Sequence, residues 1–411
     1  MKKRFLPIVA FLFSACSIEG VTEEPLTTTE QSSIITISEA LKNLDSFYET
    51  INSSGGITRS QRNRAIDEII TVKPSDIEVH TKSSDESFST DEPLVYLINY
   101  QNDGGYAILA ANSNLPDPVI AVTEKGTIDG NLMIEDNNVS QESDFSAFMQ
   151  NVIGNYLVNV GSDDQETEIE TRNNTALLNV SPLFPNWWYQ EAEFSKYCLN
   201  EAGERCLVGC VGLATAMALC RYKKNSSFVH AYGTNYNCKD MQDFLHSPKQ
   251  VVIQERESLA DSVFRYVADV AKAVHTTFGT ERSHASLQEA AIYFHSIQIY
   301  TAERHLNYKL DYVTDMLPSG KPVVMAGFNN ITFSHGHAWI VDGIQQSYKS
   351  NGSVATYLHC NWGYWGVSNG YYASKVFSPR TGPEYQDVNI DNTASERAEH
   401  NYNCYYRTLT Y

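Results

Sequence analysis

The sequence has little positive charge, and no long hydrophobic run follows its first residues. Its 411 residues include 30 Lys and Arg but 49 Asp and Glu, so the formal net charge is −19. A nucleic-acid partner would need a basic face, and none is visible in the sequence. No segment beyond the N-terminus is long and apolar enough to span a bilayer as a helix. The composition therefore argues against a nucleic-acid-binding protein and against a membrane-spanning one.

Between residues 17 and 172 the sequence has neither cysteine nor tryptophan. This part holds 28 acidic and 8 basic side chains, whereas residues 173–411 hold 21 acidic and 19 basic. The abrupt change in composition predicts a domain boundary near Arg172. It falls at the end of the polar segment 161–172 (GSDDQETEIETR), which is the best linker candidate and a natural site for proteolytic cleavage.

The first sixteen residues read MKKRFLPIVAFLFSAC, a basic start followed by a short apolar core. This pattern is typical of a secretory signal peptide. Its end resembles the lipobox of bacterial lipoproteins, which predicts cleavage before Cys16 and lipidation of its thiol; plain secretion with an incidental cysteine is the alternative. Residues 17–35 are polar, acidic and rich in Thr and Ser, so we expect a flexible tether.

Residues 36–155 are predicted to form a small α+β module. Residues 37–51 (ISEALKNLDSFYETI) show apolar periodicity. Residues 93–128 contain β-branched and aromatic runs around the turn sequence NDGG, which predicts a hairpin and a further strand.

Residues 173–411 predict helices and strands together. Helical spacing of apolar side chains runs through residues 255–275. A second helix is expected to begin after Ser286, with Glu289 three residues later as in a capping box. The segments KPVVMAGF, HAWIVDGI and VATYLHCNW (321–328, 337–344 and 354–362) are strand-like.

Seven cysteines follow Cys16, an odd number for an exported chain, because three disulfides would leave one thiol over. Cys210 is the best candidate for the free thiol. Gly209 allows a tight turn and VGLATAMALCRY favours a helix, so Cys210 is expected at a helix N-terminus, which favours the thiolate. Cys198 and Cys206 flank a short loop and could pair with each other. The alternative is that Cys210 is a core or disulfide cysteine.

His337 begins an apolar strand in SHGHAWIVDGI and could take a proton from a thiol, as cysteine nucleophiles require. His335 lies two residues earlier, and a metal site that uses this pair with His359 and Cys360 is the alternative reading. The spacing is loose and carboxylate ligands are not obvious, so no metal or organic cofactor is predicted.

Three further side chains could support a cysteine nucleophile and its histidine base. Asn361 could hold an imidazole in its reactive tautomer, and Trp362 could shield that hydrogen bond from water. The glycine-rich context HCNWGYWGVSNGYY is also compatible with a purely structural aromatic hairpin. Gln190, twenty residues before Cys210, could donate a hydrogen bond to a developing oxyanion.

Taken together, these motifs resemble the streptopain-like bacterial cysteine peptidases, which have a papain-like fold and an N-terminal propeptide. The resemblance lies in GCV…ATAMA, GHAWIVDG and NWGYWGVSNGYY, and more weakly in GGYAILAANSNLPDPVIAVTEKG of the first part. It covers roughly residues 90–380. The segment CVGLATAMAL is looser than the family's CVATAMAQ, and TERSHAS replaces a Gly-Ser-rich stretch, which puts the substrate preference of relatives in doubt.

The resemblance implies a role for each site residue. Cys210 is the nucleophile, and His337 is the general base and later the acid. Asn361 orients His337, Trp362 covers that pair, and Gln190 lines the oxyanion hole.

We therefore expect an α+β protein, with an inhibitory propeptide (36–172) before a papain-like peptidase domain (173–411) and activation by cleavage near Arg172. Its function would be that of an exported cysteine endopeptidase made as a zymogen and lipid-anchored to the cell envelope, at the outer membrane or cell surface. Its partners would be protein or peptide substrates and its own propeptide. The alternatives are another thiol acyl-transfer enzyme, such as a transglutaminase-like one, and an inactive surface-binding homologue.

Overall fold

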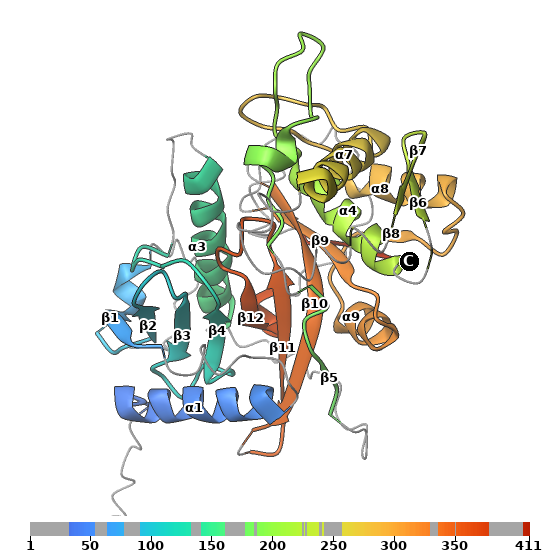
Figure 1. Ribbon diagram of the computed structural model, residues 1–411. Helices are drawn as coiled ribbons and strands as arrows, with labels where there is room; N and C mark the ends of the chain where they lie inside the picture. Colours follow the sequence, from blue (N-terminus) through green and yellow to red (C-terminus); the bar gives the residue numbers. More distant parts are fainter. Residues whose placement is uncertain are drawn as a thin grey trace, which may run out of the picture. The chain divides into compact units, whose positions relative to one another are not determined.

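The computed structural model (Figure 1) describes residues 33–53, 64–77, 91–132, 141–160, 177–184, 187–223, 226, 228–237, 241, 257–328, 336–349, 351–377 and 406–411. All elements named below belong to the unit Ile34–Tyr411. Cys16, Arg172 and His335 lie outside the described residues, as do the predicted signal segment and the linker.

An antiparallel sheet of eleven strands runs through the described residues. Its strands lie in the order β1 (Ile66–Val72), β2 (Val95–Tyr100), β3 (Tyr106–Ala110), β4 (Val119–Thr123), β12 (Gly370–Ala373), β11 (Val354–Asn361), β10 (Gly336–Tyr348), β9 (Val323–Phe328), β13 (Arg407–Thr410) and β8 (Glu303–His305), and β5 (Asn179–Val180) pairs with β10. The strands predicted within 93–128, 321–328, 337–344 and 354–362 are confirmed.

The N-terminal strands join the C-terminal strands where β4 pairs with β12. Val122 lies opposite Tyr371, and Thr123 opposite Gly370. A Cβ at Gly370 would lie 2.1 Å from the Val122 carbonyl oxygen, so only glycine allows this close approach. The strands of the predicted propeptide thus extend the sheet that carries β10 and β11.

Two helices accompany the N-terminal strands, α1 (Ile37–Ser53) and α3 (Gln141–Val160). The buried side chains of α1 recur three and four residues apart, at Ala40, Leu44, Phe47, Tyr48 and Ile51. This is the spacing of one buried helix face. Helix α3 contacts β10 and the short 3₁₀ segment η4 (Ser374–Phe377).

The longer helices of the second part are α4 (Cys210–Tyr222), α7 (Glu257–Ala273), α8 (Leu287–Ser296) and α9 (Leu310–Met316). The predicted helix within 255–275 is confirmed as α7, which packs against α4. The predicted cap is confirmed as well, because the Ser286 hydroxyl accepts a hydrogen bond of 3.2 Å from the Glu289 backbone N–H. The remaining described elements are the hairpin β6 (Phe228–Ala231) and β7 (Thr234–Asn237) and the 3₁₀ segments η1 (Pro74–Asp76), η2 (Ala192–Ser195) and η3 (Leu317–Ser319).

The mixed helix and sheet architecture confirms the predicted α+β class. Among the described residues, no helix is both long enough and apolar enough to cross a membrane. The domain boundary at Arg172 stays a prediction.

Candidate active site

Cys210 is the first residue of α4, as its sequence context predicts. Gly209 forms the N-cap with φ of 85°, a conformation that side chains rarely adopt, and a Cβ there would lie 3.2 Å from the Ser283 carbonyl oxygen. The two residues before Gly209 are held by hydrogen bonds to two other segments. The Val208 N–H donates to the Gln190 carbonyl (3.0 Å), and the Leu207 N–H donates to the Gly279 carbonyl (3.2 Å). These contacts fix the position of the thiol.

The small residues of α4 allow α7 to approach closely behind Cys210. A Cβ at Gly212 would lie only 2.8 Å from the Cβ of Ala271. A larger residue at this position would force the two helices apart, so the helix that carries Cys210 is held firmly in place.

The thiol of Cys210 is free and partly buried. Burial raises its pKa, while hydrogen bonds from the backbone N–H groups of Ala338, Val211 and Cys210 itself act in the opposite direction. The neutral thiol is therefore the favoured form here, although the helix N-terminus alone would favour a thiolate. The contact with Ala338 places the sulfur beside the residue that follows His337.

His337, the second residue of β10, is turned toward a carbonyl group. Its Nε2 atom lies 2.8 Å from the backbone oxygen of Trp362, and because a carbonyl only accepts, Nε2 carries the proton. Burial lowers the pKa of His337 to about 4, and this hydrogen bond opposes the shift. Within the part of the chain that the structure describes, no hydrogen bond joins His337 to Cys210.

Aromatic rings surround the imidazole of His337, and two of them come from helix α3. The ring centroids of Phe145 and Phe148 lie 5.5 Å and 5.8 Å from the imidazole. Tyr364 lies at 5.1 Å and Trp362 at 6.2 Å. Helix α3, from the predicted propeptide, therefore contributes two of the rings that enclose the imidazole. No feature of the sequence identified Phe145 and Phe148 as neighbours of His337.

Asn361 ends β11 opposite Ile340 of β10. Its Oδ1 atom accepts a hydrogen bond of 3.2 Å from Gly363, in a side chain that is 1% exposed. The neighbouring Trp362 ring packs against Trp339 at 4.7 Å. The sheet thus places Asn361 and His337 on adjacent strands.

Gln190 is 4% exposed, and its backbone oxygen is held by Val208. Its side-chain Nε2 has no hydrogen-bond partner among the described residues. A buried N–H group without a partner costs stability, and such groups in native proteins often mark sites that a ligand completes. Gln190 is thus an available donor near the start of α4.

His359 and Cys360 form no metal site with their described neighbours. The Nδ1 atom of His359 lies 2.6 Å from Asp342 Oδ1, and its Nε2 lies 3.5 Å from Glu124 Oε1. Burial alone would lower the pKa of His359, but Asp342 and Glu124 together raise it to about 10. The described residues contain no group of three or more His, Cys, Asp or Glu that could hold a metal ion. Glu124 follows β4, so this charged cluster spans the junction between the two parts of the sheet.

The other described cysteines, Cys198, Cys206, Cys220 and Cys360, are buried, and none of them forms a disulfide with another described cysteine. Cys206 donates a backbone hydrogen bond of 2.7 Å to Cys198, so the two face each other across the bridge between Leu199 and Arg205. Their pairing in a disulfide stays a prediction.

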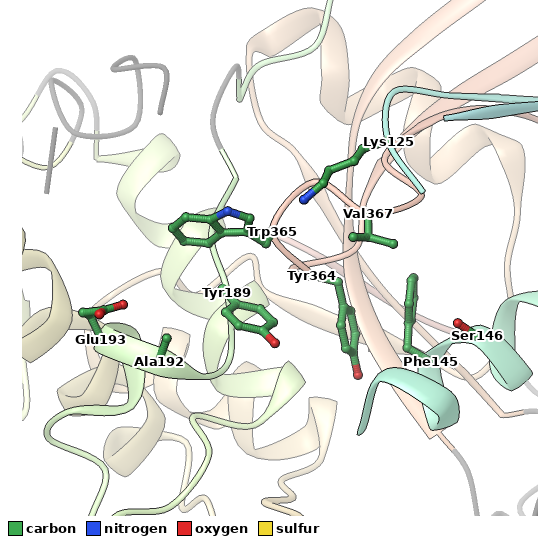
Figure 2. Close-up of a pocket in the computed structure, with 9 residues that line it drawn as sticks. All are labelled: Lys125, Phe145, Ser146, Tyr189, Ala192, Glu193, Tyr364, Trp365 and Val367. Atoms are coloured by element: carbon green, nitrogen blue, oxygen red, sulfur yellow. The ribbon is translucent and has the colours of Figure 1, made fainter. Parts of the chain in front are cut away.

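A small pocket of about 260 Å³ lies next to this site (Figure 2). Its lining comes from both parts of the chain and consists of Lys125, Phe145, Ser146, Tyr189, Ala192, Glu193, Tyr364, Trp365 and Val367. This pocket could not be predicted from the sequence, because its walls come from four separate segments.

Comparison with known proteins shows which family shares this arrangement. Residues 188–372 match the Peptidase C10 family. This region belongs to that family. The resemblance to streptopain-like peptidases is thereby confirmed, and the protein is a cysteine-type endopeptidase. Gln190, Cys210, His337, Asn361 and Trp362 all lie within the matched C10 region.

Two solved structures are similar to the chain. A mutant fragment of prointerpain A from Prevotella intermedia has 19% identity and a TM-score of 0.49, covering 83% of this chain and 98% of its own. Active wild-type interpain A cysteine protease from the same organism has 22% identity and a TM-score of 0.39, covering 56% and 94% respectively. No curated protein matches the chain in sequence.

Proposed function

We propose that the chain is the zymogen of an exported cysteine endopeptidase in which Cys210 is the nucleophile and His337 its proton-transfer partner. The observation that carries this proposal is the contact of the Cys210 sulfur with the N–H of Ala338, directly after His337. The thiol at the start of α4 thus lies next to the strand residue that follows His337, which supports a pairing of the two groups once the imidazole turns.

The reaction begins when the imidazole turns and Nδ1, the nitrogen without a proton, takes the proton of the thiol. The thiolate attacks the scissile carbonyl, and the oxyanion accepts hydrogen bonds from the Cys210 backbone N–H and from Nε2 of Gln190. His337 then protonates the departing amine, which leaves a thioester on Cys210. A water molecule, deprotonated by His337, hydrolyses that thioester and restores the thiol. Asn361 orients the imidazole during these steps.

Helix α3 keeps the enzyme latent by stabilising the other orientation of His337. Phe145 and Phe148 pack against the imidazole, and the hydrogen bond from Nε2 to the Trp362 carbonyl holds the ring in this orientation. Burial among aromatic rings disfavours the charged imidazolium form of His337, which catalysis requires. Cleavage of the chain near Arg172 would break the covalent link between α3 and the peptidase part. The helix could then dissociate, and the imidazole could turn.

The N-terminal segment supports export and attachment to the cell envelope. Its basic start, short apolar core and Cys16 suit a lipoprotein signal. The acidic residues 17–35 would then act as a tether. Mass spectrometry of the membrane fraction, with and without a Cys16→Ser substitution, tests this part of the proposal. An unchanged mass at the N-terminus would exclude lipidation.

The Cys210→Ala variant tests the catalytic proposal. We expect a stable protein that stays full length and hydrolyses no casein, whereas the unmodified chain is processed and degrades casein. Cys220→Ala is the matched control, because Cys220 is buried at the far end of the same helix. Continued self-processing and casein hydrolysis by Cys210→Ala would show that the nucleophile is misassigned.

A further inference from the structure

The pocket beside the active site has aromatic walls that will remain after activation. Tyr364 and Trp365 follow β11, and Tyr189 directly precedes Gln190. The Tyr189 ring lies 6.4 Å from that of Tyr364 and 5.9 Å from that of Trp365. These three rings belong to the matched C10 region, whereas Lys125, Phe145 and Ser146 belong to the predicted propeptide. Removal of the propeptide would therefore open this pocket on the side that Lys125, Phe145 and Ser146 now close.

The propeptide already places an aromatic ring on this wall. Phe145 stacks on Tyr364 with ring centroids 4.0 Å apart and an interplanar angle of 15°, and Figure 2 shows the two rings lying face to face. Phe145 is also 3% exposed, so its ring is fully enclosed by this contact and its neighbours. The exposed face of Tyr364 in the activated enzyme is thus shaped to receive a flat apolar side chain.

The position of the pocket identifies which part of a substrate would reach it. The amine product leaves past the group that protonates it, and the Tyr364 ring lies 5.1 Å from the imidazole of His337. The other flank of Cys210 is formed by the loop that contains Gly279 and Ser283, which contacts Leu207 and Gly209. A side chain in the pocket would therefore belong to the amine side of the scissile bond, and the acyl part would lie along the opposite flank.

We propose that this pocket selects a large aromatic or apolar residue directly on the amine side of the scissile bond, a specificity that rests on the proposed function. In the zymogen one side chain, Phe145, already stacks on Tyr364 at this wall, so the space that it leaves suits a single flat or apolar side chain. Glu193 places one carboxylate at the rim, which repels Asp and Glu. We expect phenylalanine and leucine to be preferred over glycine, and aspartate to be disfavoured most.

Competition between amines and water for the acyl-enzyme tests this preference directly. One peptide ester acylates Cys210 of the processed enzyme, and an added amino-acid amide then attacks the thioester. A new amide bond forms, the carbon–sulfur bond breaks, and the proton lost by the amine passes through His337 to the sulfur. The ratio of amide product to hydrolysis product reports on the amine-side pocket alone, because the acyl group is constant.

Phenylalaninamide is expected to outcompete glycinamide about tenfold or more at equal concentration. Tyr364→Ala should lower this phenylalaninamide-to-glycinamide ratio about tenfold. Tyr300→Ala is the matched control, since Tyr300 is 74% exposed and is absent from the pocket, and its ratio should equal that of the unmodified enzyme. If Tyr364→Ala does not fold, Glu193→Gln provides the test, because it should increase capture by aspartic acid amide and leave capture by phenylalaninamide unchanged.

The possible results distinguish a failure of the pocket proposal from a failure of the proposed catalytic function. If the ester forms no acyl-enzyme, the assignment of Cys210 fails. If an acyl-enzyme forms but all amides capture it equally, or lysinamide captures it best, the nucleophile stands and the aromatic pocket is refuted.

Discussion

Acid should destabilise the latent form because it protonates the buried imidazole of His337. Burial sets the pKa of His337 at about 4, whereas an unfolded chain has an ordinary histidine pKa of about 6.5. Because the folded-state pKa is lowered, the stabilisation is complete above pH 6.5 and is lost as the pH falls from 6.5 toward 4. At ~1.4 kcal/mol per pH unit, the loss reaches about 3 kcal/mol.

Urea unfolding of full-length Cys210→Ala measures this loss, since that variant cannot process itself. The matched control is the double variant Cys210→Ala/His337→Gln, which keeps every other titrating group. Between pH 7 and pH 4 the free energy of unfolding should fall by about 3 kcal/mol more in the variant that retains His337. Equal losses in the two proteins would show that His337 is not buried as a neutral base, and the account of latency would fail.

Three further substitutions test single contacts. Gln190→Ala removes the unpartnered buried donor and should lower kcat of the processed enzyme ~10²–10³-fold; an unchanged kcat would exclude Gln190 from the oxyanion hole. Asn361→Ala should lower kcat/KM without abolishing it, because Asn361 orients the imidazole, and a loss as complete as that of Cys210→Ala would contradict this role. Glu124→Gln removes a partner of the charged His359 and should speed processing at pH 7 about fivefold, the effect of a partly exposed ion pair worth about 1 kcal/mol. The exposed Glu68→Gln is its control, and identical processing rates would show that Glu124 does not hold the propeptide.

Local features of the sequence were sufficient to predict many elements. Gly209 and the residues after it predicted the start of α4 at Cys210, because a positive φ and helix-forming residues act within one turn. Ser286 and Glu289 predicted the cap of α8 for the same reason. The strand-like segments 321–328, 337–344 and 354–362 predicted β9, β10 and β11, and so they placed His337 and Asn361 on strands.

The orientation of His337 could not be predicted, because it depends on contacts that are distant in sequence. Phe145 and Phe148 lie nearly two hundred residues before the imidazole that they cover. Taken alone they are ordinary core residues of a helix. The pairing of β4 with β12 and the contact of Glu124 with His359 are equally remote. Such contacts follow from the assembled sheet, and a single sequence contains no local signal for them.

The latent thiol also differs from the expectation for a helix N-terminus. The partial positive charge at the start of α4 would by itself favour a thiolate. In the folded chain, burial outweighs the N–H groups of Ala338 and Val211 and raises the pKa of Cys210. The pKa of the thiol could not be predicted from the local sequence, because desolvation depends on the elements that cover the thiol in the folded chain.

Alkylation of the unreduced protein tests the central claim most directly. Iodoacetamide and a peptidyl epoxide are added before and after processing, and the modified cysteines are identified by mass spectrometry. The account predicts that Cys210 reacts rapidly only after processing, when the imidazole is free to take its proton. A Cys210 that is found in a disulfide of the processed enzyme, or that stays unmodified while the enzyme hydrolyses casein, would contradict it.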